Sequence, residues 1–278
     1  PDQVVQVNAV RLLLALLQGG CRKVQRTACE WLRGPHSTMF FLHCRDAIDG
    51  AIESLKEYKR TLKKLTRGTM TAEDRQEEAE GAEEGLQLGF GRHSLVMLIM
   101  RMLQLTMEGQ YSPMQDLFSL QPQNTASYDL LTKCVEVVEA AQPLLADSLS
   151  FNDADLAGLT LQACETISES IQGPNRGNAK ILLATNFLAA VNRSFSSLRY
   201  VSLPSRNDKI RGWDLTSNDL RCWIKTSMLS CCLAMLEAVK DPRLPTQMLE
   251  FFELHNIAEE MTANGVLLGL VDAQGFFA

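Results

Sequence analysis

Apolar residues recur at intervals of three and four along most of this 278-residue chain, and this periodicity constrains the fold more than any other feature. Clear runs are Val10, Leu13, Leu14 and Leu17, and later Leu95, Leu98, Ile99, Met102 and Leu103. Such spacing places apolar side chains on one face of an α-helix. Sustained apolar–polar alternation, which indicates β-strands, is rare, and only 6% of the residues are aromatic. The sequence therefore predicts an all-α fold.

Glycine and proline mark the ends of the first predicted helices. Gly19-Gly20 ends a helix that begins near Asp2, and Gly34-Pro35 ends the next, because glycine favours helix C-termini and proline cannot continue a helix. A long third helix is predicted from about 37 to 65. Further helices are predicted near residues 93–108, 112–121, 126–146, 154–172, 177–198, 217–240 and 245–263, with a loop over 199–216.

Charged residues divide the chain into predicted parts. The third helix ends in several Lys and Arg residues, and residues 73–84 contain seven acids. Charge blocks of this kind are usually solvated. We therefore predict an N-terminal helical hairpin plus long helix over 1–67, an acidic flexible insertion over 68–92, and a helical solenoid over 93–278.

Composition and motifs argue against several classes of protein. A formal net charge of -6 is unusual for a nucleic-acid binder. The longest apolar stretch, 94–107, is interrupted by Arg101 and Gln104 and is too short to span a bilayer, so no membrane insertion of this segment is expected. The sequence has no P-loop, dinucleotide fingerprint, nucleophile elbow or metalloprotease motif. We predict that the protein is not an enzyme.

The eight cysteines are irregularly spaced and form no C-x-x-C pair. We interpret them as reduced and mostly buried, the Cys231-Cys232 pair included, and not as disulfides or zinc ligands. The chain opens on Pro1 without a Met, which we interpret as the start of a piece of a longer polypeptide.

Three places share one pattern, in which a leucine-rich helix ends at glycine and an amide follows five or six residues later. Glycine permits the left-handed conformation that reverses the chain, and the amide is expected to reach back to carbonyls left unpaired at the helix end. Stacked helical hairpins of this kind form an α-solenoid. The residues are Gly19-Gly20 with Gln25, Gly109 with Gln115, and Gly173 with Asn178.

The same residues resemble the RIH-associated region of the intracellular calcium-release channels, a family that comprises the inositol trisphosphate receptors and the ryanodine receptors. The most specific block is Ile171-Gln172-Gly173-Pro174-Asn175-Arg176-Gly177-Asn178. The resemblance covers about 10–186. It implies an armadillo-like helical module on the cytosolic face of an endoplasmic-reticulum-like membrane. This module would be a regulatory part of a channel, in contact with the channel's other domains and subunits in a homotetramer.

Two glutamates are notable for their position at predicted helix ends. Glu108 lies in the last turn of its helix, and Glu169 lies one turn before Gly173. A carboxylate at a helix C-terminus faces the negative end of the helix dipole, and a bound cation would reverse the sign of that interaction. Calcium takes six to eight oxygen ligands, of which two carboxylates and the amide oxygen of Gln172 would supply part. The alternative is that both are ordinary solvated glutamates.

The resemblance assigns these residues to the family's activating calcium site. It matches Glu108 and Glu169 to the metal-binding glutamates and Gln110 and Gln172 to neighbouring residues, and it implies that the remaining ligand comes from the distant C-terminal part of the parent channel. The isolated chain is then expected to bind Ca²⁺ only weakly. Ryanodine receptors have histidine where this chain has Gln110, and the family usually has cysteine where it has Asn175.

The competing prediction is a helical-repeat scaffold or adaptor without a channel role. A pore-forming segment farther along the parent chain would separate the two, since a channel requires one. The sequence leaves the choice between the inositol trisphosphate and the ryanodine branch open.

Overall fold

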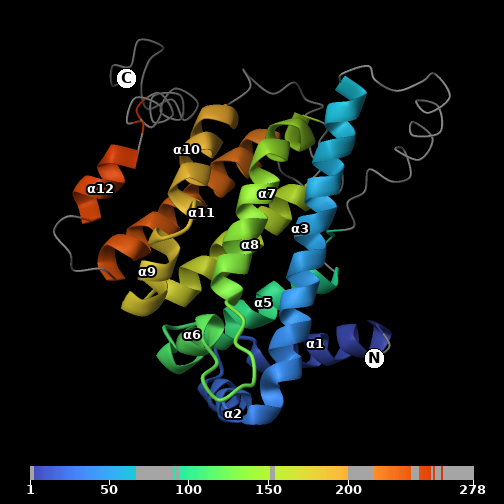
Figure 1. Cartoon of the computed structure of the whole chain (residues 1–278), viewed down its shortest axis with the longest axis vertical. Coiled ribbons are helices and arrows are strands. Elements are labelled where there is room, and N and C mark those ends of the chain that lie inside the picture. Colours follow the sequence, from blue (N-terminus) through green and yellow to red (C-terminus); the bar gives the residue numbers. More distant parts are fainter. Residues whose placement is uncertain are drawn as a thin grey trace.

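The computed structural model describes residues 3–66, 90–91, 94–150, 154–199, 216–238, 244–251, 253 and 258. The regular elements in this part of the chain are helices, with no β-strand. Figure 1 shows the helices packed side by side, with the N-terminal helix at one end of the molecule. The helices are α1 (Gln3–Leu17), α2 (Arg22–Leu32), α3 (Thr38–Thr66), α5 (Leu95–Met107), α6 (Ser112–Ser119), α7 (Leu130–Ser150), α8 (Asp155–Ile171), α9 (Arg176–Leu183), α10 (Phe187–Ser197), α11 (Ser217–Ala238) and α12 (Leu244–Phe251), with a 3-10 turn, η1 (Pro35–Ser37), before α3. The prediction of an all-α fold is confirmed.

The helices form units of three with the same internal order. We call α1–α3 unit 1, α5–α7 unit 2 and α8–α10 unit 3. The first helices contact one another in series from α1 through α5 and α8 to α11, the short second helices from α2 through α6 to α9, and the third helices from α3 through α7 to α10. Each predicted hairpin is thus followed by a third helix that packs on the next unit.

One cluster of buried apolar side chains runs through these units. Met100, Met102 and Met107 of α5 are fully or almost fully buried, as expected for methionines that fill a core. On α8 the small residues Ala157 and Ala163 are inaccessible to solvent. Because α8 contacts α5, α7 and α11, small side chains let three neighbours approach it closely.

The cysteines are free thiols. Cys231 and Cys232 are buried on α11, where the Cys231 thiol donates a 3.2 Å hydrogen bond to the carbonyl of Cys164 on α8. Burial raises the pKa of the Cys232 thiol to about 12, which suppresses thiolate formation. The prediction that these residues belong to the core is confirmed.

The single helix predicted over 177–198 is wrong, because the chain forms α9 and α10 with a turn between them. Thr185 ends α9 early, since its N–H and its hydroxyl both bond to the carbonyl of Leu182, at 3.1 and 2.6 Å. Its hydroxyl also accepts a 3.3 Å hydrogen bond from the N–H of Phe187, the first residue of α10. The helix predicted over 245–263 is described as α12 only up to Phe251, and most of its remainder lies outside the described residues.

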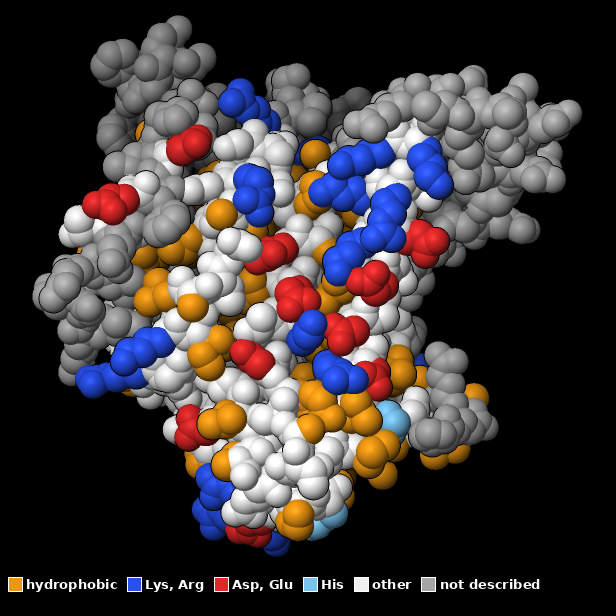
Figure 2. Space-filling view, viewed as in Figure 1, with side chains coloured by type: hydrophobic (Ala, Val, Ile, Leu, Met, Phe, Trp, Pro, Cys, Tyr) orange, Lys and Arg blue, Asp and Glu red, His pale blue; other side chains and the backbone are white. Residues whose placement is uncertain are grey.

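Residues on either side of the predicted insertion pack together, since α1 contacts α5 and α3 contacts both α5 and α7. All of 68–92 except Phe90 and Gly91 lies outside the described residues, so the predicted division of the chain stays a prediction. Figure 2 shows a band of Lys and Arg side chains on the C-terminal half of α3. Within the described part of the chain, no helix is both long and apolar enough to cross a membrane.

Candidate functional site

The turns after α1, α5 and α8 lie next to one another and share a left-handed backbone. Gly19 and Gly20 have φ of 76° and 67°, Gly109 and Gln110 have 70° and 64°, and Gly173 has 81°. Glycine adopts this conformation without strain, as the sequence predicted for these turns. A Cβ atom added to Gly20 would lie 3.8 Å from Oε2 of Glu108, and one added to Gly173 would lie 2.5 Å from Cβ of Gln110. Each turn therefore packs directly against the next.

Two buried glutamine amides join successive units. Gln25 of α2 donates from Nε2 to the carbonyls of Leu105 and Glu108, at 2.9 and 3.0 Å. Gln115 of α6 donates in the same way to the carbonyls of Glu169 and Gln172, at 2.7 and 2.9 Å. Both amides thus cap the C-terminus of the first helix in the following unit. In each case one accepting carbonyl belongs to the residue two positions before the last helical residue, and the other to the residue directly after the helix. The prediction that they reach back to the helix end of their own hairpin is wrong for these two.

The amide of Asn178 does reach back to its own hairpin, as predicted. Its Nδ2 donates to the carbonyl of Ser170 in its own hairpin at 2.9 Å, and to the carbonyl of Gln115 at 2.8 Å. The difference lies in the spacing, because Asn178 follows its glycine by five residues whereas Gln25 and Gln115 follow Gly19 and Gly109 by six. One residue rotates a helical side chain by about 100°, which turns the amide from its own hairpin towards the next one.

Asn175 caps the N-terminus of α9 and ties this helix to α6. Its side-chain oxygen accepts a 3.0 Å hydrogen bond from the N–H of Asn178, and its Nδ2 donates to Asp116 Oδ1 at 2.9 Å. The hydroxyl of Ser119 donates to Asn178 Oδ1 at 2.6 Å. Sequence reasoning missed Asp116 and Ser119, which carry no local signal for this contact. Pro174, just before Asn175, and Gly177, in the first turn of α9, are exposed.

The capped helix ends bring the two predicted carboxylates together. Glu108 is the residue that directly follows α5, one position beyond the predicted last turn, and Glu169 lies in the last turn of α8. The Gly109 N–H donates to the Glu169 carboxylate. Each glutamate also has a buried Oε2 atom without a hydrogen-bond partner. Buried carboxylate oxygens are rarely left unpaired in proteins, which distinguishes this pair from ordinary surface glutamates.

The surroundings of the Glu169 carboxyl disfavour its negatively charged form. Burial raises the pKa of the Glu169 carboxyl above its usual range, and the charges of Glu108 and Glu165 raise it further. Arg101 and the Gly109 N–H act in the opposite direction. Arg101 lies 3.6 Å from Glu165 in an exposed ion pair, so it leaves the Oε2 atoms of the pair unbonded. A cation between the two carboxylates would remove their mutual repulsion.

The two predicted neighbours are placed differently. Gln172 donates from Nε2 to the hydroxyl of Ser168 at 3.0 Å, which orients its amide. Gln110 is exposed, and its side chain packs against Gly173. Arg22 of α2 donates to the carbonyl of Gly109 and lies over the Tyr111 ring, with 5.2 Å between its guanidinium carbon and the ring centroid. Arg22 was not singled out from the sequence.

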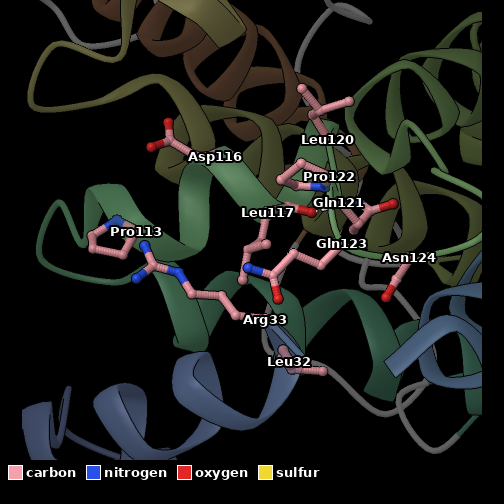
Figure 3. Close-up of a pocket in the computed structure, with 10 residues that line it drawn as sticks. All are labelled: Leu32, Arg33, Pro113, Asp116, Leu117, Leu120, Gln121, Pro122, Gln123 and Asn124. Carbon is pink, nitrogen blue, oxygen red and sulfur yellow. Dashed lines mark hydrogen bonds between the residues drawn. The ribbon is translucent and has the colours of Figure 1, made fainter. Parts of the chain in front are cut away.

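The described residues contain no group of three or more His, Cys, Asp or Glu side chains able to hold a metal ion. A small pocket of about 390 Å³ lies between the end of α2 and α6, and Figure 3 shows Arg33 extending from α2 towards Pro113. It is lined by Asp116 and the 120–124 loop, but by none of the four predicted calcium-site residues. This pocket is thus separate from the carboxylate pair.

Neutralising Glu169 is expected to stabilise the cation-free protein. A carboxyl whose pKa is raised on folding costs stability when it is charged, and the cost disappears as the pH falls through that pKa. Glu169→Gln should therefore raise the free energy of unfolding at pH 7 by about 0.3–1 kcal/mol, with a difference that shrinks towards pH 4. Urea unfolding in chelator measures it, with Glu30→Gln on the exposed face of α2 as control. A lower stability for Glu169→Gln would contradict this account.

A family model described as RyR and IP3R Homology associated matches residues 92–195. The match begins just before α5 and ends within α10, so it covers all of unit 2, most of unit 3 and both carboxylates. This match confirms the resemblance to the RIH-associated region over residues 92–195.

Proposed function

We propose that this chain is a cytosolic regulatory module of an intracellular ligand-gated calcium-release channel. In this proposal it forms an armadillo-like α-solenoid, contributes part of an activating calcium site and couples other cytosolic domains to the pore. The family match supports the channel class. The observation that carries the site is the pair of glutamates from successive units, each with a buried oxygen that has no hydrogen-bond partner.

The oxygen atoms of these residues are the type of ligand that calcium prefers, but there are too few of them to complete its coordination. Glu108 and Glu169 offer hard carboxylate oxygens, and Gln172, three residues after Glu169, offers an amide oxygen, whereas calcium takes six to eight oxygens. The rest would come from another part of the parent protein and from water. With calcium bound, the repulsion between the carboxylates becomes a shared attraction to the ion. Completion of the site would therefore link this module to the segment that supplies the missing ligands.

The same geometry suggests how the module transmits a change. Gln25 of unit 1 holds the Glu108 carbonyl, and Gln115 of unit 2 holds the Glu169 carbonyl. A movement of Glu108 or Glu169 would therefore also move its backbone carbonyl, and through the bonded glutamine amide it would displace the preceding unit. We propose that this series couples the channel's other domains and subunits, in a homotetramer at an endoplasmic-reticulum-like membrane, to the pore.

Calcium titration of the isolated chain tests the half-site. We expect calcium to raise the free energy of unfolding only weakly, reaching about 1.4 kcal/mol when its concentration is ten times Kd. Glu108→Gln and Glu169→Gln should each abolish this increase, while Glu30→Gln keeps it. Differential scanning fluorimetry, with magnesium as a second cation, measures the effect. An equal response from all variants would refute the assignment of the ligands.

In the intact channel the same substitutions should shift the calcium activation curve to concentrations at least about tenfold higher. An unmoved curve would exclude the activating role even if the isolated chain bound calcium. A scaffold without a channel role is the remaining candidate, and a parent protein that has no pore-forming segment would favour it.

A further inference from the structure

A wide apolar groove lies at the unit 1 end of the molecule, and neither glutamate of the carboxylate pair lines it. It measures about 910 Å³ and is bounded by α1, α3 and the flank of α2, with α5 as its floor. Val10 and Leu13 line it from α1, Phe40 and Ala47 from α3, and Ile99 from α5. Apolar side chains remain exposed on its rim, with Leu16 and Trp31 both at 52%. A water-facing apolar surface of this kind marks a site of interaction.

Units 2 and 3 show what covers the corresponding groove. In unit 2 the first and third helices are α5 and α7, both rest on α8, and α3 of the preceding unit packs on both. In unit 3 the corresponding pair is α8 and α10, both rest on α11, and α7 packs on both. In unit 1 the pair is α1 and α3, which rest on α5, and no described helix covers them. The groove is thus the position that a preceding third helix would occupy.

The C-terminal end of α1 gives independent evidence that a neighbouring unit is missing at this face. The carbonyls that receive a glutamine amide lie two residues before the last helical residue and one residue after it, in α5 and again in α8. The matching carbonyls at the end of α1 belong to Ala15 and Gln18. Among the described residues no side-chain amide donates to either of them. In units 2 and 3 the preceding unit covers the groove and caps the helix end. In unit 1 no described helix covers the groove, and no described side-chain amide caps the end of α1.

We propose that this groove is the docking site for the third helix of a further helical repeat unit, whose second helix presents an amide to Ala15 and Gln18. The covering helices α3 and α7 define the chemistry of the occupant. Their buried faces carry apolar residues at helical spacing, such as Phe41, Cys44, Ile48 and Ile52 on α3. The groove follows α1 from Gln6 to Leu16, about 15 Å of helix, which fits an amphipathic segment of about three turns.

Site-specific photo-crosslinking in the intact parent protein tests this proposal. A benzophenone amino acid replaces Leu13 in the groove, and as a control it replaces Leu233, an exposed apolar residue of α11. We expect the Leu13 product to map by mass spectrometry to one segment with apolar residues at i, i+3, i+4 and i+7, and the Leu233 product not to contain it. A product with lipid, with residues 67–89 of this chain or with α1 of a second copy, or no product, would overturn the proposal.

Two further variants test the groove itself. Ala47→Trp fills it, and Val10→Asp places a carboxylate against the docked helix. Each should reduce the Leu13 product about tenfold or more, because burial of an unpaired charge or a clash removes the docked state. Leu233→Asp is the matched control and should leave the yield unchanged. An unchanged yield in Ala47→Trp, with native circular dichroism, would overturn the proposal even if Val10→Asp failed to fold. Calcium binding is not involved, so failure here leaves the proposed calcium site untouched.

Discussion

Replacing Gln115 with alanine should lower the free energy of unfolding by about 2–4 kcal/mol, the largest effect that we expect from one polar side chain in this protein. Gln115 is only 1% exposed, and its amide bonds to the Glu169 and Gln172 carbonyls at 2.7 and 2.9 Å. Its removal leaves two carbonyls at the end of α8 without a donor. Each such unpaired group costs about 1–3 kcal/mol. Urea unfolding, with an unchanged dependence on denaturant, measures the loss.

Matched variants separate capping from the loss of volume. Gln115→Glu keeps the shape but sets a carboxylate oxygen against the two carbonyls, so it should destabilise at least as strongly as alanine. Gln123→Ala, in the exposed loop after α6, should change the stability by less than about 0.5 kcal/mol. A Gln115→Glu variant as stable as the wild type would show that the amide does not act as a cap. Gln25→Ala should repeat the effect at the end of α5.

Gly173→Ala is the second large effect, with an expected loss of about 2–3 kcal/mol. A non-glycine residue at φ of 81° costs about 1–2 kcal/mol. The added Cβ would also lie 2.5 Å from Cβ and 2.7 Å from Cγ of Gln110, so the neighbouring turn must move. Thermal and urea unfolding both report the change.

Gly19 supplies the control for the strain alone. It has a φ of 76°, but a Cβ added there would meet nothing within 4 Å, so Gly19→Ala should cost only about 1–2 kcal/mol. In a Gly173→Ala background, Gln110→Gly should recover the difference between the two alanine variants, since it removes the clashing side chain. Equal losses at Gly19 and Gly173 would show that the packing of the two turns contributes nothing.

Features that depend on the local chain were predictable from the sequence. The apolar periodicity predicted the helices and the glycines predicted the left-handed turns, because both follow from neighbouring residues alone. The break between α9 and α10 was not predicted, because it depends on the bonds from Thr185 to the Leu182 carbonyl, which a single threonine in the sequence does not indicate. Both carboxylates were singled out from their place beside the turns and from the family resemblance, and their role as calcium ligands stays a prediction.

The direction of the glutamine caps needed the tertiary structure. A spacing of six residues differs from one of five by a single helical step, and the sequence does not show that this step turns Gln25 and Gln115 towards the next unit. Nor does it show that Gly109 donates to Glu169, or that two glutamates 61 positions apart each keep a buried oxygen without a partner.

By itself, then, the periodicity of apolar residues determined an all-α chain with reversals at Gly19-Gly20, Gly109 and Gly173, because helix formation and left-handed turns are governed by short-range sterics and burial. Only the tertiary structure decided which unit each buried amide caps, how the turns bring Glu108 and Glu169 together, and which groove stays open. These depend on the packing of helices far apart in the chain, where the need to pair buried carbonyls and cover apolar faces selects one arrangement of the units.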